Sequence, residues 1–346
     1  MEKLFVSFMC VLFATLSAGV HAKRWDPAIL DLERIELAPN VYAVVDTLSA
    51  EWLEENASAA TSGGFIVGEK GVLVVESFVN ARLAAQMIAL INEVTRKPIL
   101  YVVNTSYHGD HMYGNYLFPN ATIIQHEESR KYAEEHWEDD LNFMLNMFGH
   151  PDGHDGMQEN SPRTGDILIT DDTDYIRVDL GDRNVEIRQF GFGQTKGDLQ
   201  VWLPDEKVFW TGNSLIGPAP LVPWLTEGGH ALSLATLKRY RDFLPEGTTI
   251  VSGHSVPFKI GDENDGLDFH IAYLSALDES VRTSVENGLG LMDTVDAAEM
   301  PEFSAYDLFN WNHKQMNVPC AYKHYMAMAG KELTEEEQAV TQHCHN

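Results

Sequence analysis

The stretch that decides the fold is "YVVNTSYHGDH", residues 101–111. An apolar run ends at Val103 and polar side chains follow at once, which is typical of a buried strand that ends in a functional loop. Imidazole nitrogens and carboxylate oxygens are ordinary zinc ligands, so His108, Asp110 and His111 predict a metal or catalytic site. The alternative is a pair of ordinary surface or core histidines. Three such side chains in four residues do not easily meet at one ion, which favours two subsites.

Three later strand-like runs end in the same way. Residues 184–190 precede Gln194, residues 207–212 precede Asn213, and residues 248–253 precede His254. Loops that follow strands are where sheet-based folds gather polar groups, so we expect these side chains to converge on one site.

The remaining pattern predicts two sheet-rich halves, each with helices, and therefore a layered α/β sandwich. A helix with Asn80 as its cap is expected over 80–97, and another near 231–243. Strands are expected at 41–46, 63–68, 72–77, 99–104 and 121–125, with hairpins over 175–190 and 198–212 and a strand at 248–253. After residue 268 the chain turns helical.

Four motifs give the chain its resemblance to the metallo-β-lactamase superfamily over residues 38–256. They are "TSYHGDH" (105–111), "GFGQTKGD" (191–198), "TGN" (211–213) and "SGH" (252–254), with "VYAVVD" and "GGFIVGEKGVLVVES" in family order before them. The resemblance implies a four-layer αβ/βα sandwich with the site along one edge between its two sheets. Together with the helical region after residue 268 and a predicted signal peptide at the N-terminus, it leads us to expect three parts: a signal peptide (1–22), a metallo-β-lactamase-like domain (23–268) and a C-terminal helical extension (269–346).

Departures from the family pattern suggest a single metal ion. The three positions of the family's first metal site hold Ser106, His108 and Gln194, so one ligand of three survives. The second site is intact as Asp110, His111 and His254, whereas Asn213 replaces the aspartate that bridges both ions. Neutral side chains are weak zinc ligands, and the lost carboxylate removes charge that holds two dications together. We expect one zinc ion, or another divalent metal, with Asn213 as a weak fourth donor.

The resemblance implies a hydrolase of ester-type bonds: esters, thioesters, lactones, lactams or sulfate esters. Asp110 and His108 are the predicted catalytic residues, and Ser106, Gln194 and Lys196 are predicted to contact the substrate. Two alternatives stay open. One is an inactive metal- or ligand-binding protein, and the other is a lyase or isomerase on the same scaffold that uses His108 as its base.

The first 22 residues predict a cleaved signal peptide, with Lys3 before an apolar run and "VHA" at 20–22. A membrane anchor is the alternative, and no later run reaches the roughly 18 apolar residues of a spanning helix. The protein is therefore expected to be periplasmic or secreted. Cleavage leaves Cys320 and Cys344, which either bridge in an oxidising compartment or stay unpaired.

The formal net charge of −28 argues against nucleic acid and membrane surfaces as partners. The expected partner is a small-molecule substrate, as the resemblance implies. The sequence leaves the oligomeric state open.

Residues 148–160 carry a second group of polar side chains: His150, Asp152, His154 and Asp155. The segment favours a solvated loop, with a metal loop or a lid as alternatives. Three aromatic residues are candidates for either a pocket wall or the core: Trp52, Tyr113 and Trp224.

Overall fold

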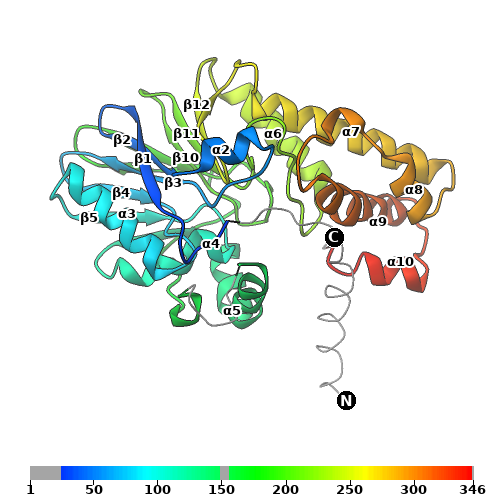
Figure 1. The fold of residues 1–346 in the computed structure, drawn as a ribbon, viewed down its shortest axis with the longest axis horizontal. Helices are drawn as coiled ribbons and strands as arrows, with labels where there is room; N and C mark the ends of the chain where they lie inside the picture. Colours follow the sequence, from blue (N-terminus) through cyan, green and yellow to red (C-terminus); the bar gives the residue numbers. More distant parts are fainter. Residues whose placement is uncertain (1–24, 149–155, 345–346) are drawn as a thin grey trace.

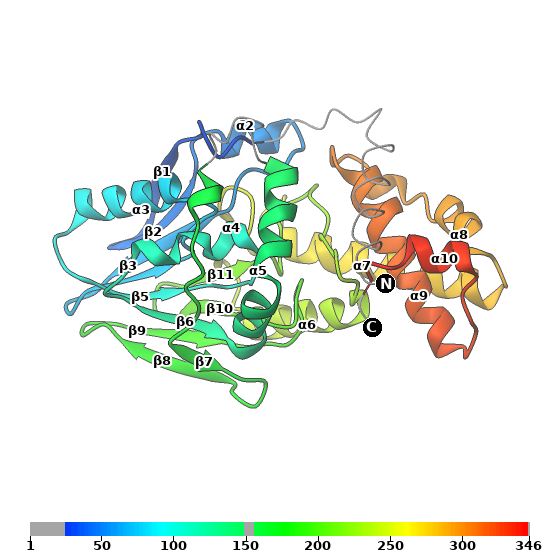
Figure 2. The same cartoon turned by 90° about the horizontal axis from the view of Figure 1, so that it is seen from below.

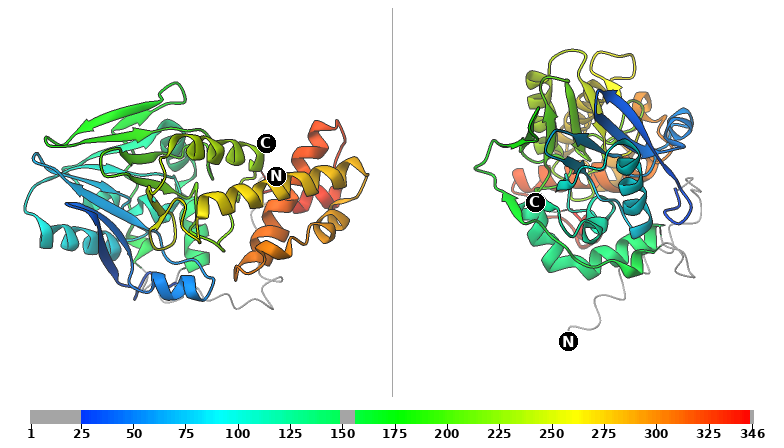
Figure 3. Two further views of the ribbon diagram at one scale, coloured as in Figure 1. Left: turned by 90° about the horizontal axis from the view of Figure 1, so that it is seen from above. Right: turned by 90° about the vertical axis from the view of Figure 1, so that its left-hand side faces the viewer.

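The structure is a computed structural model that describes residues 25–148 and 156–344 (Figure 1). The predicted signal peptide at 1–22 lies outside the described residues, and so do His150, Asp152, His154 and Asp155. Two β-sheets pack face to face with helices on their outer sides, which confirms the predicted αβ/βα sandwich (Figure 3).

The first sheet has seven strands in sequence order, antiparallel from β1 to β4 and parallel from β4 to β7. Its members are β1 (Leu32–Ala38), β2 (Val41–Asp46), β3 (Gly63–Val67), β4 (Val72–Val75), β5 (Ile99–Val103), β6 (Thr122–His126) and β7 (Ile167–Ile169). The meander predicted over 41–77 is confirmed as β2, β3 and β4. The edge strands β1, β7 and β13 were not predicted: charged residues interrupt the apolar pattern of β1, and β7 and β13 have only three and two residues.

The second sheet has six strands in the order β13-β12-β11-β10-β9-β8. They are β8 (Tyr175–Asp179), β9 (Asn184–Arg188), β10 (Gln200–Leu203), β11 (Val208–Gly212), β12 (Thr249–Ser252) and β13 (Phe258–Lys259). The β8–β9 and β10–β11 pairs are the two predicted hairpins, and β11 pairs with β12 in parallel.

Helices cover the outer faces of both sheets (Figures 1 and 2). The helix predicted over 80–97 is α3 (Ala81–Val94), and the Asn80 side chain caps it by accepting a hydrogen bond from the Leu83 amide at 2.9 Å. α3 lies on the first sheet and α6 (His230–Phe243) on the second. The other helical segments that precede β7 in the chain are α2 (Ser49–Glu54), α4 (Gly109–Met112), the 3-10 helices η1 (Tyr113–Leu117) and η2 (Met157–Glu159), and α5 (Glu127–Phe148).

Alternation along the strands explains why the sandwich has an apolar layer on each side of a sheet. In β2, Val41 and Ala43 join the cluster between the two sheets. Tyr42 and Val44 point the other way and pack in the cluster that contains Met87 of α3. Because successive strand side chains face opposite sides, a strand with both faces covered must be apolar throughout.

The C-terminal helices continue the second half of the sandwich. They are α7 (Gly266–Glu286), α8 (Leu291–Ala297), the 3-10 helix η3 (Pro301–Phe303), the π-helix η4 (Asn310–Asn317), α9 (Val318–Met328) and α10 (Glu335–Val340). One apolar cluster joins Phe209 of β11 and Tyr240 of α6 to Leu274 of α7 and Tyr322 of α9. The domain boundary at 268 stays a prediction. Within the described residues, no helix combines the length and apolar character needed to cross a bilayer.

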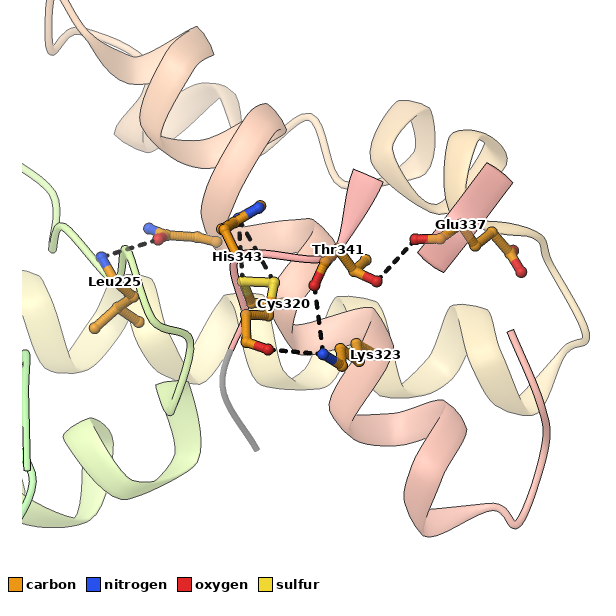
Figure 4. Close-up of a disulfide and its surroundings, with 8 residues drawn as sticks. Leu225, Cys320, Lys323, Glu337, Thr341 and His343 are labelled. Atoms are coloured by element: carbon orange, nitrogen blue, oxygen red, sulfur yellow. Dashed lines mark hydrogen bonds between the residues drawn. A yellow bond between two sulfur atoms is a disulfide. The ribbon is translucent and has the colours of Figure 1, made fainter. Parts of the chain in front are cut away.

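A disulfide joins Cys320 in α9 to Cys344 near the end of the chain (Figure 4). Of the two alternatives that the sequence left for these cysteines, the structure contains the bridge. Lys323 supports it by donating hydrogen bonds from Nζ to the carbonyl oxygens of Cys344, at 2.7 Å, and of Thr341, at 3.4 Å.

Candidate metal centre

The loops after the strands meet at one edge of the sandwich. The chain leaves β5 at Val103 and forms the short helix α4, which carries Asp110 and His111. His254 follows β12 in the other sheet. Oδ2 of Asp110 lies 3.4 Å from Nε2 of His254 and 3.6 Å from Nε2 of His111. All three side chains are buried, and one ligand atom of each lies within 4.8 Å of the other two.

Each imidazole presents Nε2 to this centre because Nδ1 has another neighbour. Nδ1 of His111 lies 3.1 Å from Oε1 of Glu76, and Nδ1 of His254 lies 3.1 Å from the carbonyl oxygen of Ala59. Neither Nε2 has a hydrogen-bond partner among the described residues. Metal-binding histidines are commonly oriented in this way, with the second nitrogen on a carboxylate or a carbonyl. Two imidazole nitrogens without a hydrogen-bond partner and a buried carboxylate therefore fit a divalent cation such as zinc.

The charges in the centre are strongly coupled. Burial alone raises the pKa of Asp110, but the neighbouring His111 and His254 outweigh it and lower that pKa below its usual value. Oγ1 of Thr61 also donates a hydrogen bond to Oδ2 of Asp110 at 2.5 Å. Burial lowers the pKa of His111, yet the carboxylates of Asp110 and Glu76 raise it to about 9. Because a ligating imidazole is neutral, a cation and a proton compete for His111.

The structure also brings together Ser106, His108 and Gln194. Oγ of Ser106 lies 3.4 Å from Nδ1 of His108, and burial lowers the pKa of His108 to about 4, while the Gln194 side chain acts in the opposite direction. Two hydrogen bonds hold Gln194 in place. Its main-chain N–H donates to Oδ2 of Asp198 at 2.5 Å, and its side-chain Nε2 donates to the carbonyl oxygen of Trp224 at 2.8 Å. These three positions thus form a subsite beside the candidate metal ligands. Their roles as substrate contacts stay predictions, as does that of Lys196, which lies on an exposed turn.

Two glycines allow the close approach of the loops. Gly212 has a φ of 51°, and a Cβ there would lie 2.0 Å from Oγ1 of Thr105. A Cβ on Gly253 would lie 2.1 Å from Oδ1 of Asn213. Asn213 therefore packs against the residue that precedes His254, and its buried Oδ1 has no hydrogen-bond partner among the described residues. The role of Asn213 as a weak fourth donor stays a prediction.

Two residues around the candidate ligands, Glu76 and Thr61, were not named from the sequence, and a third, Trp224, was left open between a pocket wall and the core. Glu76, at the end of "VLVVES", is buried at 1% exposure and accepts a hydrogen bond from Oγ1 of Thr105. A charged residue that ends an apolar strand was the available signal. Thr61 had no distinguishing signal. Trp224 lies against His254 with ring centroids 4.6 Å apart and ring planes tilted by 39°, whereas the other two aromatic candidates, Trp52 and Tyr113, are buried in the core.

Comparison with known proteins gives one family and several solved structures. The family model described as the metallo-beta-lactamase superfamily matches residues 60–254. The chain is similar to a metallo-beta-lactamase from Pontibacter korlensis, with 15% identity and a TM-score of 0.52 over 71% of this chain and 99% of that one. It is similar to the DIM-1 metallo-beta-lactamase, with 12% identity and a TM-score of 0.50 over 71% of this chain and 97% of that one.

A third similar structure is the stereoselective inverting sec-alkylsulfatase Pisa1 from Pseudomonas sp., with 15% identity and a TM-score of 0.60. The likeness covers 87% of this chain, more than the two lactamases cover, but only 51% of the alkylsulfatase. At these identities the three structures bear on the fold alone.

Proposed function

Because the chain belongs to the metallo-β-lactamase superfamily, we propose that it is a hydrolase that works with one divalent metal ion, zinc in the first instance. Asp110, His111 and His254 would hold the ion. The observation that carries the proposal is the convergence of two buried Nε2 atoms on Oδ2 of Asp110, at ion-pair distance and with no hydrogen-bond partner for either nitrogen among the described residues. A buried carboxylate and two aimed imidazoles are costly to maintain unless a partner satisfies them.

The composition of the neighbouring subsite supports one ion and not two. Ser106 and Gln194 offer neutral oxygen atoms where a second dication needs imidazoles, and Asn213 offers an amide where it needs a bridging carboxylate. Only His108 is a strong ligand at that end. Two dications a few ångströms apart require negative charge between them, which an asparagine does not supply.

A divalent ion in this fold supplies Lewis-acid polarisation and makes water more acidic near neutral pH. The residues of the chain would do the rest. Asp110 lies at the centre of the ligand set and would orient the attacking water. His108, in contact with Ser106 and Gln194, would accept the proton of that water and return it to the leaving group. The Ser106 hydroxyl and the Gln194 amide would donate hydrogen bonds to the developing oxyanion.

The proposed substrates share an electrophilic carbonyl or sulfonyl centre: esters, thioesters, lactones, lactams or sulfate esters. The lactam and the sulfate ester are among these classes because proteins of this fold include metallo-beta-lactamases and an alkylsulfatase, and the substrate panel below chooses among them. We also propose that the protein is exported, since the Cys320–Cys344 disulfide is of the kind that persists in oxidising compartments.

Metal analysis of the full-length protein tests the single ion. We expect about one equivalent of bound zinc per chain after dialysis against a buffer that contains trace zinc. The His111→Ala variant should lose this bound zinc. His136→Ala is the matched control, because His136 is an exposed histidine on α5 and should keep the metal. Two equivalents in the wild type, or an unchanged content in His111→Ala, would contradict the proposal.

Activity is tested with a panel of ester, thioester, lactone, lactam and alkyl sulfate substrates, with and without a chelator. Turnover of at least one class should disappear with the chelator and return with zinc. His108→Ala should retain the metal and lose most of that turnover, by about 10²-fold or more. A metal-loaded protein that turns over none of the panel would favour a binding protein instead.

A further inference from the structure

We infer that the C-terminal helices complete the candidate metal centre by holding Trp224 against His254. The inference rests on the proposed metal site, and it adds a positioning residue and a role for the extension. The indole ring lies with its centroid 4.6 Å from that of the His254 imidazole, at an interplanar angle of 39°. His254 therefore has Trp224 on its face and the Ala59 carbonyl oxygen on Nδ1.

Trp224 contacts three parts of the molecule at once. Its ring touches the ligand His254, and its carbonyl oxygen accepts a hydrogen bond from Nε2 of Gln194 at 2.8 Å. Its indole Nε1 donates to the hydroxyl of Tyr306 at 2.9 Å. Tyr306 lies in the C-terminal extension and is buried. One residue thus joins the candidate ligand set, the neighbouring subsite and the extension.

The π-helix η4 holds the backbone on both sides of Trp224. Asn312 donates from Nδ2 to the carbonyl oxygen of Pro223 at 3.0 Å, and Asn317 donates to the same oxygen at 2.9 Å. Oδ1 of Asn317 accepts from the Leu225 amide at 3.3 Å. Both asparagines are buried, where an unmade hydrogen bond leaves an unsatisfied polar group. The segment that carries Trp224 is therefore fixed from the extension.

Tyr306 also reaches the second segment that holds His254. Its hydroxyl donates to Oγ of Ser58 at 3.2 Å. Ser58 precedes Ala59, whose carbonyl oxygen lies 3.1 Å from Nδ1 of His254 and whose amide donates to the His254 carbonyl oxygen at 2.9 Å. The hydroxyl of Tyr306 thus links the two walls between which the imidazole lies.

The orientation of the His254 ring decides where Nε2 points, so these contacts bear on metal affinity. Residues that orient metal-binding histidines typically change affinity by about 10- to 100-fold when they are removed. Tyr306→Phe removes the hydroxyl that links the two walls and keeps the ring that fills the core. Trp224→Phe keeps an aromatic face on His254 but removes the indole N–H, and Trp224→Ala removes both.

The experiment measures the zinc Kd of the full-length protein by competition with a chromophoric chelator. We expect the Kd to rise about tenfold in Tyr306→Phe and by about 10- to 100-fold in Trp224→Ala, with Trp224→Phe weaker than the wild type by less than Trp224→Ala. Tyr322→Phe is the matched control: it removes a buried hydroxyl of the same extension that donates to Glu337 at 2.8 Å, away from Trp224, and should stay within about twofold of the wild type.

A second readout follows the geometry directly. Co²⁺ bound beside His254 should quench the emission of Trp224 more than that of the other six tryptophans in the chain. The quenched component should vanish in Trp224→Phe and shrink in Tyr306→Phe at saturating Co²⁺. A role confined to folding stability would leave this amplitude unchanged.

The outcomes separate this inference from the proposed function. If the wild type binds zinc through His111 while Tyr306→Phe has an unchanged Kd, or one no weaker than that of Tyr322→Phe, the inference is wrong and the metal site stands. If Co²⁺ bound to the wild type does not quench the emission of Trp224, the inference is likewise wrong and the metal site stands. If the wild type binds neither metal, the proposed function and the inference both fail.

Discussion

Removal of the Cys320–Cys344 disulfide should destabilise the protein by an amount set by the length of chain that it closes. The bridge joins residues 24 positions apart and encloses α10 and most of α9. A cross-link stabilises mainly by reducing the entropy of the unfolded chain, and closing a loop of this length is worth about 3.5 kcal/mol at room temperature. This value is a large fraction of the 5–15 kcal/mol that is typical of a folded domain.

The perturbation is the double variant Cys320→Ala/Cys344→Ala, compared with oxidised wild type by urea unfolding followed with far-UV circular dichroism. With a slope of about 3 kcal/mol per M urea, the expected loss lowers the unfolding midpoint by about 1 M. Reduced wild type is the control: it lacks the cross-link but keeps both sulfur atoms, so its midpoint should match that of the variant. Reductant should leave the variant unchanged.

Equal midpoints for oxidised wild type and the variant would refute this reasoning. A second result would also refute it, because Cys320, His343 and Cys344 together could hold a metal ion in place of a disulfide. Nε2 of His343 lies 3.4 Å from Sγ of Cys320 and 3.5 Å from Sγ of Cys344. Two titratable thiols in the denatured, unreduced protein would show that the cysteines are not bridged. Zinc bound through His343 would then identify a metal site in place of the disulfide.

Leu83→Ala should lower the free energy of unfolding by about 2–5 kcal/mol, because the Leu83 side chain is 1% exposed. Leu232 is 60% exposed, so Leu232→Ala should change that free energy by less than about 0.5 kcal/mol. Urea unfolding midpoints measure both effects, and equal effects would contradict the assignment of Leu83 to the core. Gly253→Ala places a Cβ 2.1 Å from Oδ1 of Asn213, so we expect a stability loss of about 1–3 kcal/mol and weaker zinc binding, and a variant with wild-type zinc affinity would show that Asn213 does not matter there. Burial raises the pKa of Glu227 to about 7, so the folded state keeps a proton that the unfolded chain has already released, and wild-type stability falls as pH rises between the two pKa values. Glu227→Gln should therefore be more stable than wild type by about 3 kcal/mol near pH 8 and equal to it near pH 4, and a difference that does not vary with pH would contradict the raised pKa of the carboxyl.

The chain contains enough local pattern to predict most of the sandwich. Apolar runs mark β2 to β6, and the helical periodicity with its Asn80 cap marks α3. The edge strand β1 was missed because charged residues on its solvent side interrupt the apolar pattern, and β7 and β13 were missed because three and two residues are too few to indicate a strand. The spacing of apolar residues along a strand indicates how much of that strand is buried. It does not indicate which other element of the fold covers it.

The candidate ligands were also predictable, and for a similar reason. Asp110, His111 and His254 each follow directly after a predicted strand, so their convergence at one sheet edge follows from the topology. The substitutions at Ser106, Gln194 and Asn213 were visible as departures from a motif and are the basis for the single ion.

What the amino-acid sequence indicated by itself is therefore the order of most strands and helices, the candidate ligands at the strand ends and the departures from the family motifs at Ser106, Gln194 and Asn213, because each of these is visible within a short motif. Tertiary structure alone decided which groups orient those ligands. Glu76 reaches His111, and Tyr306 links Trp224 to Ser58, across long stretches of sequence. The physical reason is that such contacts depend on how finished elements pack against one another, and no local pattern of charge or hydrophobicity records that packing.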